Sequence, residues 1–115
     1  MSFPVNEGET FSISYQHSVN QSLVTELFEI NEGRIILSAL EFGTFGAGMP
    51  TEIESGQTLV HLPGGGIRIE GFDRPMDRFV YLVGYTTQHT LHIGNKSIPL
   101  NTLAEAGQPI RFTLQ

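Results

Sequence analysis

The chain has 115 residues, of which 39% are hydrophobic, and its 12 acidic and 6 basic side chains give a formal net charge of −6. This length predicts one domain, residues 1–115, with its own core, and the acidic balance argues against a nucleic-acid partner, which needs clustered Lys and Arg. The absence of cysteine excludes disulfides, zinc–thiolate sites and a cysteine nucleophile.

The sequence contains no run of about 18 apolar residues, so no segment is expected to span a bilayer. It starts Met1-Ser2-Phe3-Pro4, without the basic region and apolar stretch of a signal peptide. Two explanations stay open at this point: a cytosolic protein, or a mature segment placed behind a new Met.

Two strands are predicted near the N-terminus. Over residues 10–17, apolar and polar side chains alternate, which is typical of a half-buried strand and places His17 on the apolar side. Residues 23–30 form the second strand, after a polar connection. One face of it carries Val24, Glu26, Phe28 and Ile30. Glu26 is therefore a carboxylate among apolar neighbours on its own face.

The rest of the chain reads as short strands separated by turns. Asn31-Glu32-Gly33 predicts a hairpin turn with a left-handed glycine, followed by a returning strand over residues 34–42. Further strands are predicted over residues 57–62, 67–72, 78–87, 89–93, 96–100 and 109–114, with a charged turn over 72–77. Residues 101–106 form the one predicted helical turn.

Eight or nine strands in hairpin order predict an all-β, antiparallel domain with at most one helical turn. Connections this short leave no room for the crossovers that parallel strands need. The strands are expected to close as a barrel or a sandwich, because either arrangement protects strand edges. Residues 1–9 precede the first strand as an N-terminal segment.

A glycine-rich stretch, Phe45-Gly46-Ala47-Gly48-Met49, stands just before Pro50. Glycine lacks the Cβ that normally forbids positive φ and close backbone approach, so the stretch predicts a shaped loop. Two interpretations remain: a binding loop that presents Phe45 and Met49, or a structural corner whose glycines form a bulge.

Three polar residues, His17, Glu26 and His89, share strand faces with apolar ones, whereas His92 falls on the opposite face from His89. We predict that the three converge near the glycine-rich loop and bind a ligand. The alternative is that each is hydrogen-bonded in the core, since strand parity gives a face and not a distance. The full predicted ligand-binding set is His17, Glu26, Phe45, Gly46, Ala47, Gly48, Met49 and His89.

Enzymatic chemistry has weaker support. Two histidines and a carboxylate resemble a metal-binding set, but no HxH or HxxxH spacing joins these histidines, so no metal and no cofactor is predicted. His17 and Ser18 are adjacent on a strand and point to opposite faces, which suits them poorly as base and nucleophile. The alternative function kept open is a small hydrolase or metal-dependent enzyme that uses His17, Glu26 and His89.

Three landmarks together carry a family resemblance: Tyr15-Gln16-His17-Ser18-Val19 with Glu26 downstream, then residues 45–50, then His89 with Leu91. The chain resembles the domain-of-unknown-function family eighteen-fifty, over residues 11–114. It departs from the family pattern at Gln16, at Asn20, where the family has an acidic residue, and at Thr44, where serine is common.

The resemblance implies a small exported protein, periplasmic or tethered at the cell surface, that is associated with TAXI-type TRAP transporters. It implies no reaction. The expected function is therefore a non-enzymatic, extracytoplasmic accessory or binding domain whose partner is a transporter component or a small solute. The first residues would then be the remnant after a removed signal or anchor.

Overall fold

In the computed structural model the described residues are 5–16, 23–43, 54–76, 78–82 and 88–113, with 78–82 described by their backbone alone. This part of the chain forms nine strands and one 3₁₀ turn, η1. The strands are β1 (Thr10–Gln16), β2 (Leu23–Asn31), β3 (Arg34–Phe42), β4 (Thr58–His61), β5 (Ile67–Pro75), β6 (Arg78–Leu82), β7 (Thr90–Ile93), β8 (Lys96–Pro99) and β9 (Pro109–Thr113). The turn η1 spans Leu100–Thr102 and overlaps the predicted helical turn over residues 101–106 only at residues 101–102.

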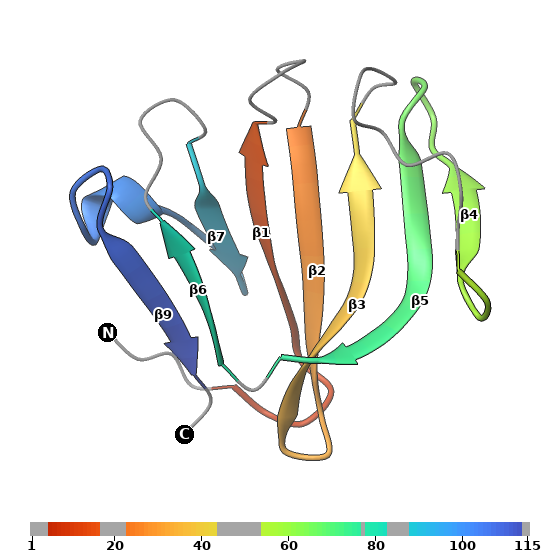
Figure 1. Cartoon of the computed structure of the whole chain (residues 1–115), viewed down its shortest axis with the longest axis horizontal. Coiled ribbons are helices and arrows are strands. Elements are labelled where there is room, and N and C mark those ends of the chain that lie inside the picture. Colours follow the sequence, from red (N-terminus) through yellow and green to blue (C-terminus); the bar gives the residue numbers. More distant parts are fainter. Residues whose placement is uncertain (1–4, 17–22, 44–53, 77, 83–87, 114–115) are drawn as a thin grey trace.

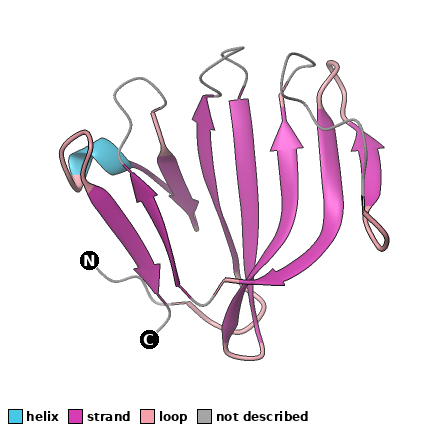
Figure 2. Ribbon diagram, in the orientation of Figure 1, coloured by secondary structure: helices cyan, strands magenta, loops and turns pink. Residues whose placement is uncertain are grey.

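Seven of the strands form one curved sheet in the order β4-β5-β3-β2-β1-β7-β8, and β6 pairs with β9 in a separate ribbon (Figure 1). Every pairing among the described strands is antiparallel, so the all-β, antiparallel prediction is confirmed (Figure 2). The sheet ends at β4 on one side and β8 on the other, so the described strands do not close into a barrel.

Two clusters of buried side chains share one face of the sheet, here called the inner face; the opposite face is the outer face. The first cluster contains Ile13, Phe28, Ile30, Ile35, Leu37, Leu91 and Leu100. The second contains Val24, Phe42, Ile67 and Ile69. Ile110 and Phe112 of β9 pack against the first cluster, so the β6–β9 ribbon covers that part of the inner face.

The β2–β3 hairpin has the predicted turn. Glu32 and Gly33 both have positive φ, 53° and 70°, which is the geometry that matches the twist of the flanking strands. The Glu7 carboxylate accepts hydrogen bonds from the backbone N–H groups of both turn residues, and the Gly8 N–H donates to the Ile30 carbonyl. These contacts dock the segment before β1 onto the hairpin.

A bulge at Ser38 keeps both halves of β3 facing the core. Leu37 pairs with Phe28 and Ala39 with Leu27, so Ser38 is an extra residue, and its hydroxyl donates to the Leu27 carbonyl. The extra residue shifts the alternation by one position, as bulges do. The inner face of β3 consequently carries Ile35, Leu37, Leu40 and Phe42.

The predicted charged turn over residues 72–77 is wrong in its position, because β5 continues to Pro75. Gly71 and Asp73 have positive φ, 87° and 46°, and the strand bends there while it keeps its pairing with β3. At Gly71, an added Cβ would collide with the carbonyl oxygen of Gly56. Only glycine fits this close approach.

Gly71→Ala should therefore destabilise the domain more than Gly64→Ala. Both glycines have nearly the same φ, 87° and 88°, but the space around the Gly64 Cβ position is open. Backbone strain should cost about 1–2 kcal/mol in either variant, and the collision in Gly71→Ala about 1–3 kcal/mol more. Urea unfolding measures both values; equal losses would contradict the close approach.

Candidate functional site

The tyrosine at the end of β1 stacks on a histidine from a distant part of the chain. The ring centroids of Tyr15 and His89 lie 4.7 Å apart, with an interplanar angle of 23°. The cause is strand register: β1 pairs with β7 so that Ile13 faces Leu91, and both side chains are buried on the inner face. Tyr15 comes two residues after Ile13, and His89 comes two residues before Leu91, so the antiparallel register places both on that same face.

Glu26 joins this pair from the other neighbour of β1. In the β1–β2 register it lies opposite Ile13, and in the β2–β3 register opposite Leu40, on the inner face. Its half-buried carboxylate is close enough for its negative charge to act on the Tyr15 phenol. The structure thus brings two of the predicted site residues, Glu26 and His89, around Tyr15, a residue that the sequence analysis treated as part of a strand.

The surroundings shift the pKa of both the Tyr15 phenol and the His89 imidazole. Burial and, second, the charge of Glu26 raise the pKa of the Tyr15 phenol above its ordinary value of 10.0. Burial lowers the pKa of the His89 imidazole below its ordinary value of 6.5. Near neutral pH the cluster therefore presents a protonated phenol and an uncharged imidazole beside the Glu26 carboxyl group.

The backbone at His89 is held by a buried anchor. The N–H of Leu100 donates to the His89 carbonyl over 2.9 Å, and the Leu100 side chain is fully buried in the first core cluster. The short turn η1 after β8 therefore fixes where β7 begins. Through this hydrogen bond, the core packing of Leu100 helps to hold the backbone that carries the imidazole.

The other predicted site residues lie outside the described part of the chain: His17, and the glycine-rich stretch Phe45, Gly46, Ala47, Gly48 and Met49. Their convergence with Glu26 and His89 stays a prediction. Among the residues that the structure describes, no group of three His, Cys, Asp or Glu side chains is placed to hold a metal ion.

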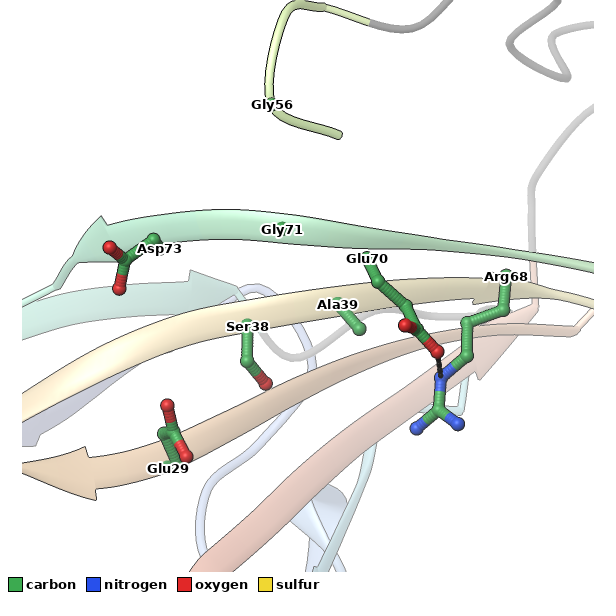
Figure 3. Close-up of a pocket in the computed structure, with 8 residues that line it drawn as sticks. All are labelled: Glu29, Ser38, Ala39, Gly56, Arg68, Glu70, Gly71 and Asp73. Carbon is green, nitrogen blue, oxygen red and sulfur yellow. Dashed lines mark ion pairs between the residues drawn. The ribbon is translucent and has the colours of Figure 1, made fainter. Parts of the chain in front are cut away.

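A hollow of about 600 Å³ lies on the outer face of β2, β3 and β5, away from the predicted residues (Figure 3). Glu29, Glu70 and Asp73 line it together with Arg68, whose Nε lies 3.7 Å from Glu70 Oε1. Arg68 Nε also lies 3.4 Å from Glu41 Oε1. The guanidinium is thus paired with carboxylates of its own sheet, and the hollow is open and predominantly acidic.

A second polar cluster was missed by the sequence analysis. On the outer face, Ser14 Oγ lies 2.8 Å from His92 Nε2, and His92 Nδ1 lies 3.0 Å from Ser97 Oγ. The three residues belong to the adjacent strands β1, β7 and β8. Strand parity placed His92 opposite His89, but the sequence carries no spacing signal that joins residues from three strands.

Comparison with known proteins identifies one family. A family model described as "Domain of unknown function (DUF1850)" matches residues 11–100. The chain belongs to this family. No curated protein and no solved structure matches the chain significantly. Membership confirms the resemblance and brings no assigned reaction with it.

We also searched the described residues for a helix that could span a membrane. No helix among them has the length and apolar character needed to cross a bilayer.

The Glu26→Gln variant should lower the pKa of the Tyr15 phenol while leaving it above 10.0, because burial remains. Since the chain has 3 tyrosines and no tryptophan, tyrosinate absorbance reports the titration directly, and Tyr15→Phe identifies the Tyr15 step. An unchanged midpoint in Glu26→Gln would contradict the proximity of the two groups.

The raised pKa of Tyr15 also makes the stability of the folded domain depend on pH in the alkaline range. Above pH 10.0 the unfolded chain releases the Tyr15 proton before the folded chain does, so the folded state binds more protons and loses stability as pH rises through the folded pKa. Tyr15→Phe should show a shallower decline in unfolding free energy over that alkaline range.

Proposed function

We propose that this domain is a non-enzymatic, extracytoplasmic binding domain that serves a TAXI-type TRAP transport system. The observation that carries a binding site is the cluster of Tyr15 on β1, Glu26 on β2 and His89 just before β7, brought together on the inner face. The family resemblance supplies the cellular setting and the class of partner. The partner is a transporter component, or a small solute that the system handles.

The raised pKa of Tyr15 suits a binding role for its phenol better than a role in proton transfer. A general acid or base works best when its pKa lies near the working pH. The pKa of Tyr15 is instead raised further above neutrality, which suits a fixed hydrogen-bond donor. A neutral imidazole and a carboxylate beside it provide both donors and acceptors for a polar group, framed by apolar side chains.

For the finer architecture we propose a two-layer sandwich, with the β6–β9 ribbon as the second layer. Packing of Ile110 and Phe112 against the first core cluster supports this arrangement. β1 ends at Gln16, β2 begins at Leu23 and β3 ends at Phe42, all at the end of the sheet where Tyr15 lies. We propose that His17 and the glycine-rich stretch complete the site there.

The test is a pull-down against the solute-binding protein of a TAXI-type system encoded with this chain. His89→Ala and Phe45→Ala should each weaken capture by at least about tenfold, or about 1.4 kcal/mol. The matched control is His61→Ala, because His61 is an exposed histidine on β4, which three other strands separate from β1 in the sheet.

Two negative results together would overturn the proposal. The wild-type protein would capture no transporter component, and its melting temperature would not shift with any of a panel of amino acids, dicarboxylates and polyamines. Equal capture by wild type, His89→Ala and Phe45→Ala would place the interface elsewhere and remove the role of the inner-face cluster.

A further inference from the structure

The outer-face cluster of Ser14, His92 and Ser97 has the geometry of a nucleophile, a base and a group that orients the base. Ser14 Oγ and His92 Nε2 are 2.8 Å apart, within reach for proton transfer. His92 Nδ1 and Ser97 Oγ are 3.0 Å apart. In the tautomer whose Nδ1–H donates to Ser97, Nε2 is left free to accept the Ser14 proton.

The sheet holds this arrangement in place. Ser14, on the outer face, is only 9% exposed, while Ser97 is exposed. His92 pairs directly with Ser12 on one side and Ser97 on the other, so backbone ladders on both sides fix the strand that carries the imidazole. The side chains need no rearrangement to reach one another.

We propose that Ser14 is a nucleophile activated by His92, with Ser97 as a positioning residue, and that it accepts an acyl group from activated esters or thioesters. Ser14 Oγ attacks the carbonyl carbon and its proton passes to His92 Nε2. The bond to the leaving alkoxide or thiolate breaks, and that group takes up the proton. The product is an ester on Ser14, without any change of oxidation state.

Strand pairing limits the class of donor. Over residues 11–14, β1 is paired on both sides, with β2 and with β7, so the backbone N–H groups of this stretch are used in the ladders and do not form an oxyanion hole. Losing one such donor costs an enzyme about 10²–10³ in rate. Acyl donors with good leaving groups, such as activated esters and thioesters, can react without an oxyanion hole, whereas amides cannot.

The test is incubation of the whole protein with p-nitrophenyl acetate, followed by peptide mass spectrometry. The peptide containing Ser14 should gain one acetyl group in the wild type and none in Ser14→Ala. His92→Gln should slow Ser14 acetylation by about 10²-fold, the usual contribution of a general base. Ser97→Ala should slow it by a smaller factor, and Ser97→Thr, which restores the hydroxyl, should recover the rate.

Ser55→Ala is the matched control, because Ser55 is an exposed serine in the turn before β4, at the opposite side of the sheet from β7 and β8. In this variant Ser14 should be acetylated at the wild-type rate. Circular dichroism confirms that each variant is folded. A Ser14 that stays unmodified, or that acetylates equally fast in His92→Gln, would overturn the proposal. Neither result bears on the binding role proposed for the inner-face cluster, because the two clusters lie on opposite faces of the sheet.

Discussion

The pairing of β1 with β7 is the constraint on which both polar clusters depend. It joins residues near the start of the chain to residues about 80 positions later, and it sets Ile13 opposite Leu91 in the core. On the inner face this register stacks Tyr15 on His89. On the outer face it brings Ser14 to His92. A slip of one residue would exchange the faces and dismantle both contacts at once.

The register itself is stabilised by apolar burial. Ile13 is fully buried and Leu91 nearly so, and removing either side chain from its place would expose surface worth about 1.5–3 kcal/mol. Leu100 adds a second tie, because its buried side chain holds the N–H that binds the His89 carbonyl. The polar groups of the two clusters are thus positioned by hydrophobic packing next to them. Their own interactions contribute less to the fold.

The local conformations were predictable to the extent that single residues dictate them. The β2–β3 turn followed from Asn31-Glu32-Gly33, and the bounds of β3 were predicted as observed, because a glycine turn and an apolar run both act locally. The bend of β5 was missed. Residues 72–77, with Pro75, were predicted as a turn, yet the partner strand β3 keeps the chain paired through Pro75, so tertiary contact overrode the local signal.

The sequence by itself determined the all-β, antiparallel class, the faces of Glu26, His89 and His92, and the family to which the chain belongs. Alternation along a strand is a property of the backbone and can be read without a partner. Only the tertiary structure decided which strands became neighbours, and therefore that Glu26 lies beside Tyr15 and that His92 reaches Ser14 and Ser97. Distances between strands depend on long-range pairing, which the periodicity of one strand does not encode.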